Sequence, residues 1–122
     1  MASSGAAVRR ALRYLALGAL LLAVSPAQGQ DLRGWFLDVG QGDASLFVSS
    51  VGTVVLVDAG PSGSADTIRA VMAKAGVERI DVVVLTHAHV DHIGGLRGLI
   101  GDVPIRRVLD PGFPPPSRVY ER

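Results

Sequence analysis

The sequence predicts a small α/β domain in which helices pack on a mixed, mostly antiparallel sheet. Three observations lead to this prediction. Short apolar and β-branched runs alternate with glycine-rich turns between residues 34 and 57. An amphipathic helical pattern covers residues 65–75. A continuous apolar run at 80–85 then leads into a loop that contains every histidine of the chain. The expected order is strands, helix, strand, histidine loop, helix and strand.

Residues 1–29 have the pattern of a secretory signal peptide rather than of the domain. Three arginines precede an apolar core. The core is much shorter than the ~20 residues that a membrane-spanning helix requires. Small residues predict cleavage of the signal peptide between Ala27 and Gln30. Cleavage there leaves 30–122 as the domain. An uncleaved N-terminal anchor is the alternative. We therefore expect a secreted or periplasmic protein without a stable membrane span.

Charge and composition exclude some classes of function. The chain has 12 basic and 11 acidic residues, and removal of the three arginines in the leader leaves nine against eleven. This balance gives no electrostatic signature of nucleic-acid binding. The absence of cysteine excludes disulfides, thiolate metal sites and cysteine nucleophiles. Any metal must be held by His, Asp or Glu. No oligomeric state is predicted.

The first three strands are expected at 35–37, 44–48 and 53–57. Their β-branched and apolar residues are typical of strands, and turns at 39–42 and 49–52 separate them. The short spacing predicts an antiparallel meander.

A helix is expected from Ala65 to Ala75. Ser64 is placed to cap its N-terminus, and Gly76 is placed for a left-handed C-terminal stop. The residues that share its inward face at helical spacing are Ala65, Ile68, Val71, Met72 and Ala75.

Two further elements are expected after this helix. The apolar run at 80–85 is typical of a strand that is covered on both faces, and residues 104–109 predict a last strand. Between them a short helix is expected at 93–100, although its three glycines weaken the helical pattern. Its inward side chains are expected to be Leu96, Leu99 and Ile100.

Three histidines and an aspartate fall within six positions, where a buried strand is expected to end. His87 and His89 are two apart, so an extended backbone places both side chains on one side and can aim them at one ion. Asp91 and His92 follow where the chain turns, and they can point to a second ion. Imidazole and carboxylate ligands suit zinc, with manganese or iron as alternatives. Two ions ~3.5–4 Å apart form a clamp for hydrolysis.

The segment Thr86–Gly95 resembles the HxHxDH signature of the metallo-β-lactamase-fold hydrolases. The resemblance implies the front half of an αββα fold and a site for two zinc ions. It implies that His87 and His89 bind one ion, that Asp91 and His92 bind the other, and that Asp91 is also the catalytic acid or base.

Two other segments resemble the same family, although each alone also fits an ordinary turn. Leu56–Gly60 resembles its first motif, which implies that Asp58 supports the ligands from behind, and Thr86 is expected to do the same. Leu37–Ala44 resembles the subgroup related to the C-terminal domain of ComEC-type DNA-uptake proteins. This second resemblance implies a substrate loop formed by Gly40, Gln41, Gly42 and Asp43.

The family completes its site with a further His, Asp and His downstream, whereas this chain has no histidine after His92. We therefore expect half of a two-metal site and a truncated domain. The predicted function is an exported metal-dependent hydrolase, whose activated water attacks a phosphodiester or an ester- or amide-type bond of a small-molecule or nucleic-acid substrate. The alternatives are a non-catalytic metal-binding module and an inactive fragment.

Overall fold

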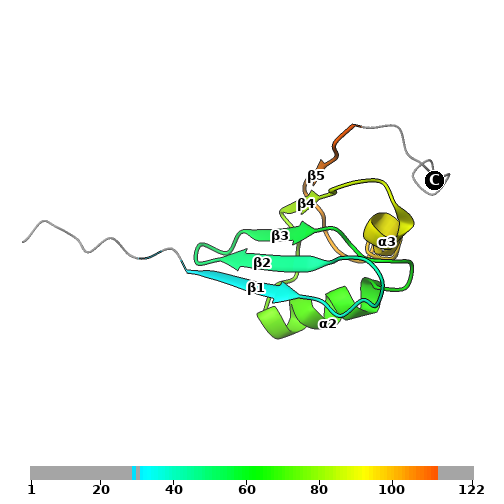
Figure 1. Cartoon of the computed structure of the whole chain (residues 1–122). Helices are drawn as coiled ribbons and strands as arrows, with labels where there is room; N and C mark the ends of the chain where they lie inside the picture. The colour runs from blue at the N-terminus through cyan, green and yellow to red at the C-terminus, as the bar shows by residue number, and fades with distance from the viewer. Residues whose placement is uncertain (1–28, 30, 113–122) are drawn as a thin grey trace, which may run out of the picture.

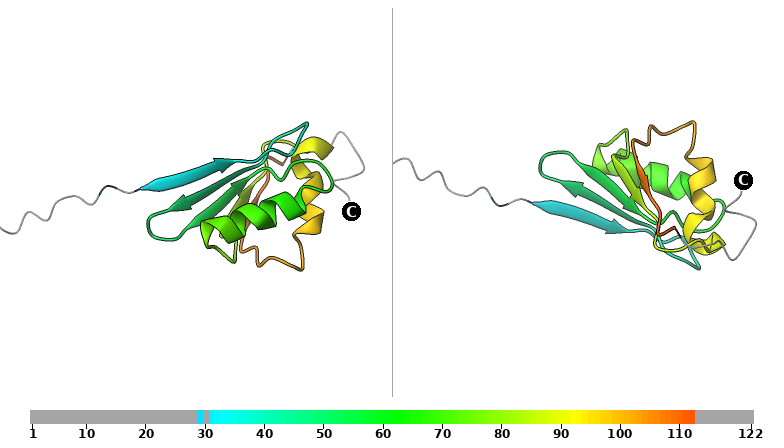
Figure 2. Two further views of the ribbon diagram at one scale, coloured as in Figure 1. Left: turned by 90° about the horizontal axis from the view of Figure 1, so that it is seen from below. Right: turned by 90° about the horizontal axis from the view of Figure 1, so that it is seen from above.

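The computed structural model describes residue 29 and residues 31–112. This part of the chain forms a five-stranded sheet with the strand order β1-β2-β3-β4-β5 (Figure 1). The long helix α2 lies in front of the strands when the molecule is seen from below and behind them when it is seen from above (Figure 2). The predicted mixed α/β fold is therefore confirmed. The predicted leader falls outside the described residues except for Gly29.

The first three strands form the predicted antiparallel meander. They are β1 (Leu32–Phe36), β2 (Ser45–Ser49) and β3 (Val54–Val57). β1 begins earlier than predicted, because residues 32–34 also pair with β2. Along β2 and β3, buried side chains alternate with partly exposed ones, as expected for strands that cover a core with one face.

Helix α2 (Ala65–Ala75) has the predicted bounds and ends at Gly76, whose φ of 74° is left-handed. Its predicted inward residues are buried, except for Val71, which is partly buried. Ser64 precedes the helix, but its side chain makes no capping hydrogen bond. Its backbone is already helical, with φ −71° and ψ −10°, whereas a capping serine needs an extended backbone to aim its hydroxyl at the first turn.

Strands β4 (Val82–Val84) and β5 (Val108–Leu109) extend the sheet, and both pair in parallel with the strand before them in the sheet. α2 is the crossover that parallel pairing of β3 and β4 requires. Both strands are shorter than predicted, because Ile80 and Ile105 meet only in an isolated bridge.

The prediction that β4 is covered on both faces is wrong for the described residues. Val83 is fully buried, whereas Val82 and Val84 are only partly buried. Within the part of the chain that the structure describes, the buried strand residues pack with the helices in one cluster on one face of the sheet. The fully buried centre of this cluster includes Leu46, Leu56, Ile68, Val83 and Leu99.

The second helical segment differs from the prediction. It begins earlier, as the short helix α3 (Val90–Ile93), and continues as the 3₁₀ helix η1 (Gly94–Gly98). Leu99 is fully buried and Leu96 packs against the core, as predicted. Ile100 was predicted to be inward but is 67% exposed, because the helix ends before this residue and the chain turns away. Among the described helices, none is both long and apolar enough to cross a bilayer.

Candidate metal centre

The predicted site residues meet at one edge of the sheet. β3 and β4 are parallel neighbours, so the residues that follow them emerge at the same edge. Asp58 follows β3 directly, and Thr86 lies two residues after β4. The N–H of Asp58 donates to the carbonyl oxygen of Val84 at 2.9 Å, which keeps the two chain segments together beyond the strands.

Asp58 is the most constrained residue of this edge. It is 2% exposed, and it is the only non-glycine residue of the described part with a positive φ, of 53°. Its Oδ1 accepts the Thr86 N–H at 2.8 Å. Its Oδ2 accepts the Thr86 hydroxyl at 2.6 Å and the Nδ1–H of His92 at 2.9 Å. Three donors therefore hold one carboxylate in a backbone conformation that costs on the order of 1 kcal/mol.

These contacts assign the tautomers of two imidazoles. Thr86 gives its single hydroxyl proton to Asp58, so at the 3.0 Å contact with Nδ1 of His87 its oxygen must be the acceptor. In their neutral form, His87 and His92 thus both carry the proton on Nδ1. Nε2 then keeps a free lone pair, which is the form of histidine that binds a metal.

The three histidine rings lie close together, but they do not converge on one position where an ion could bind. The ring centroids of His87 and His92 lie 4.0 Å apart, and those of His87 and His89 lie 4.7 Å apart. Among the described residues, no group of three or more His, Asp or Glu side chains is already spaced to hold an ion. The structure thus brings His87 closer to His92 than to His89, its predicted partner at one ion.

One pair of side chains comes close to the spacing of metal ligands. Oδ2 of Asp91 lies 3.9 Å from Nε2 of His92, while two ligands of a tetrahedral ion lie ~3.4 Å apart for bonds of ~2.05 Å. Imidazole nitrogens and a carboxylate are also the donors that zinc accepts. The kinds of donor present therefore fit a divalent ion, and among the described residues the exposed His89 ring is free of the hydrogen bonds that hold His87 and His92.

The predicted substrate loop lies against the histidine loop. The carbonyl oxygen of Asp43 accepts the Gly60 N–H at 2.8 Å, and Oδ2 of Asp43 lies 3.9 Å from Nδ1 of His92. The Gly40 N–H donates to Oδ1 of Asp38 at 3.4 Å, while Gln41 is exposed. Gly42 lies against the backbone of Asp91.

Backbone contacts that were not predicted from the sequence hold the histidine loop from the other side. The Ala59 N–H donates to the carbonyl oxygen of His92 at 2.6 Å, and the Gly95 N–H donates to that of Gly60 at 3.0 Å. A Cβ atom on Gly95 would lie 2.1 Å from the Ala59 oxygen. The Gly94–Gly95 pair at the end of the histidine segment carried this signal, but its close approach to the loop after β3 was not predicted.

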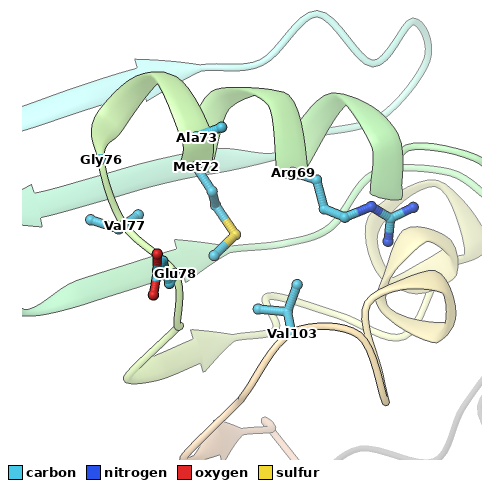
Figure 3. A pocket seen from close by; sticks show the side chains of 7 residues that line it. All are labelled: Arg69, Met72, Ala73, Gly76, Val77, Glu78 and Val103. Carbon is cyan, nitrogen blue, oxygen red and sulfur yellow. The ribbon is translucent and has the colours of Figure 1, made fainter.

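A cavity of about 450 Å³ lies beside α2 rather than at the histidine loop (Figure 3). Met72 points toward it from the helix, and Val103 faces it from the opposite side. No predicted metal or loop residue lines this cavity, so it does not support a substrate pocket at the candidate centre. Its lining residues are Arg69, Met72, Ala73, Gly76, Val77, Glu78 and Val103.

Comparisons with known proteins agree with this fold. The model of the metallo-β-lactamase superfamily matches residues 37–117. A ribonuclease Z of Bradyrhizobium diazoefficiens is 35% identical over 66 residues, which cover 54% of this chain and 21% of that protein. A ribonuclease Z of Alkaliphilus oremlandii is 38% identical over 68 residues, which cover 56% and 20%. The chain therefore spans about a fifth of the length of these relatives.

A solved structure gives the same result for the fold. A mutant of a metallo-β-lactamase from Cronobacter sakazakii superimposes with a TM-score of 0.52 at 28% identity, over 61% of this chain and 30% of that one. The described sheet and helices thus match a fragment of that fold. Because the family model covers more than half of the sequence and includes the whole histidine loop, the chain belongs to the metallo-β-lactamase superfamily.

Proposed function

We propose that this chain carries part of the active centre of a metal-dependent hydrolase, in which His87, His89, Asp91 and His92 are the metal ligands. Membership of a superfamily of hydrolases supports this proposal. The observation that carries it is the hydrogen-bond network of the buried Asp58, which fixes His87 and His92 with Nε2 free. Zinc is the metal that this donor set favours.

The residues at this edge have distinct tasks in the proposed reaction. Bound divalent ions would supply Lewis acidity and lower the pKa of an attacking water. Asp58 and Thr86 hold the two imidazoles in position. The Asp91 carboxylate lies beside Nε2 of His92, where it can both bind a metal and accept the proton of the water. A carboxylate in that place is suited to general-base catalysis.

A phosphodiester is the proposed substrate, and an RNA or a related nucleic acid is its proposed source. The two ribonuclease Z relatives support this choice over other bonds that the same centre can hydrolyse. The resemblance of 37–44 to the ComEC-type subgroup supports it as well, with Gly40 to Asp43 as the loop that meets the substrate. A shared fold alone does not determine a substrate.

The complete centre is proposed to need ligands from outside these 122 residues. His92 is the last histidine of the chain, and the chain spans about a fifth of its ribonuclease Z relatives. The leader-like residues 1–29 support export of the protein. The DNA that follows codon 122 tests the need for further ligands. A continuation that encodes His, Asp and His in that order is expected.

Zinc content and phosphodiesterase turnover of the purified chain test the proposal. The chain is expected to retain zinc but not to hydrolyse bis(p-nitrophenyl) phosphate above background. Two zinc ions per chain together with turnover that Asp91→Asn abolishes would show that the centre is complete without further ligands. Failure to retain any zinc would refute the metal centre.

The second candidate is a metal-binding module without catalysis. It is favoured by the placement of four candidate ligands, His87, His89, Asp91 and His92, within six residues of one loop, which could hold a single ion. It predicts one tightly held zinc ion and no gain of hydrolysis when the downstream sequence of the relatives is fused to this chain. A gain of hydrolysis in that fusion would favour the enzyme.

A further inference from the structure

The backbone of Asp91 lies directly against Gly42, a residue almost fifty positions away in the sequence. A Cβ atom built on Gly42 would lie 1.9 Å from the carbonyl oxygen of Asp91, 2.7 Å from its carbonyl carbon and 2.9 Å from its Cβ. Two of these three atoms belong to the backbone, so a side-chain rotation of Asp91 does not relieve the clash. Only glycine therefore allows this approach, and its φ of 106° also favours glycine.

The turn that carries Gly42 is anchored to the sheet. The Leu37 N–H donates to the carbonyl oxygen of Ala44 at 2.9 Å, which closes the turn at its base, and the Gly60 N–H donates to that of Asp43 at 2.8 Å. Ala44 is 3% exposed. Hydrogen bonds thus hold the turn around Gly42 closed at its base and tie it to the loop after β3.

The histidine loop is held against Gly42 from the other side. The Ala59 N–H donates to the His92 carbonyl oxygen at 2.6 Å. A Cβ atom on Gly94 would lie 2.5 Å from the backbone nitrogen of Ser62. The first turn of α3, with Asp91 and His92, is therefore enclosed between the turn before β2 and the loop after β3. A shift of the turn before β2 or of the loop after β3 would therefore displace both Asp91 and His92.

We propose that Gly42 is a positioning residue, which sets where the Asp91 carboxylate lies relative to Nε2 of His92. The inference rests on the proposed metal centre and deepens it. It assigns the glycine turn a role in metal binding through its contact with the Asp91 backbone, in addition to the proposed contact with substrate.

Gly101 provides a control outside the candidate centre. Its φ of 93° is also left-handed, but a Cβ atom on Gly101 would meet nothing within 4 Å. Gly101→Ala and Gly42→Ala both place alanine in a left-handed conformation. Only Gly42→Ala also displaces Asp91, so a difference between the two variants reports the contact with the metal loop.

The test measures zinc affinity of the 122-residue chain by competition with a chromophoric chelator, and the visible spectrum of its cobalt(II) form. Gly42→Ala is expected to weaken zinc binding by about 10- to 100-fold, as loss of a supporting residue does, and to alter the cobalt spectrum. Gly101→Ala is expected to leave both unchanged. Equal affinities and equal spectra of the two variants would overturn the proposal.

Two further measurements separate this inference from the proposed function. In the metal-free protein, Gly42→Ala is expected to shift the amide resonances of Asp91 and His92, whereas shifts confined to the turn itself would overturn the inference. A wild-type chain that binds no zinc would refute the metal centre even if those resonances shift. If Gly42→Ala does not fold, a pair of glycines inserted after Gly40 should free the contact without added bulk; unchanged zinc affinity would then overturn the inference.

Discussion

At the scale of single residues, Asp58 links the fold to the candidate chemistry. Its carboxylate accepts two hydrogen bonds from Thr86 and one from His92, and its left-handed backbone is held by them. The sequence motif predicted that Asp58 supports the ligands. It did not predict that the Thr86 hydroxyl, which donates to Asp58, also contacts His87. The contact between Asp58 and Thr86 depends on the parallel pairing of β3 and β4.

Asp58→Asn is expected to weaken zinc binding by about 10- to 100-fold. Asparagine keeps the size of the side chain and tolerates a left-handed backbone, but one acceptor oxygen becomes a donor that faces Thr86 or His92. Zinc titration of the purified variant checks this expectation. Asp66→Asn is the control, because Asp66 is an exposed aspartate in the first turn of α2. Equal losses of affinity in the two variants would contradict the role of Asp58.

At the scale of elements, the local signals of the sequence predicted α2 well. Its periodicity, its position after Ser64 and its stop at Gly76 depend on neighbours along the chain. The helix after the histidine loop was predicted less well. Its start and its 3₁₀ continuation depend on how closely Gly94 and Gly95 approach the loop after β3. Such a tertiary contact leaves no periodic signal in one sequence.

Asp81 joins the beginnings of β3 and β4 at the edge opposite to the candidate centre. Its Oδ2 accepts the Val54 N–H at 2.9 Å, and its Oδ1 lies 3.0 Å from Nε of Arg79 and 3.3 Å from a guanidinium nitrogen of Arg106. The Val54 amide, followed by Arg79, lowers the pKa of Asp81 below its ordinary value of 3.8. The ionised carboxylate therefore favours the folded chain.

Acid should remove this contribution. Because the pKa is lower in the folded than in the unfolded state, the stabilisation is present above 3.8 and is lost as the pH falls through the folded pKa. Asp81→Asn is expected to unfold at lower denaturant concentration than the wild type at neutral pH, with a difference that shrinks in acid. Denaturant unfolding across this pH range checks it. A difference that stays constant down to the lowest pH would contradict this account.

At the scale of the whole molecule, the sheet has one covered and one open face in the part that the structure describes. Alternation and register place seven apolar side chains of the first four strands on the face away from α2. The sequence predicted the apolar strands but could not predict which face the helices leave open. These side chains are Leu32, Phe36, Phe47, Val55, Val57, Val82 and Val84.

This open face is expected to bind a hydrophobic dye, since an exposed contiguous apolar surface does so. Phe36→Ser is expected to lower the fluorescence of bound anilinonaphthalene sulfonate, because Phe36 is 84% exposed at the edge of this face. Val51→Ser serves as the control. Val51 is 82% exposed but lies in the turn between β2 and β3, so the dye signal should not change. An equal decrease in both variants would show that the dye does not report the sheet face.

Zinc retention by the purified protein shows whether the histidine loop binds metal. The wild-type chain and His89→Ala are loaded with zinc, dialysed side by side and analysed for metal per chain. The exposed ring of His89 has no hydrogen bond among the described residues, so its loss should leave the fold unchanged. We expect the wild type to retain zinc and His89→Ala to lose it. Equal zinc in both proteins would show that the histidine loop is not the metal site.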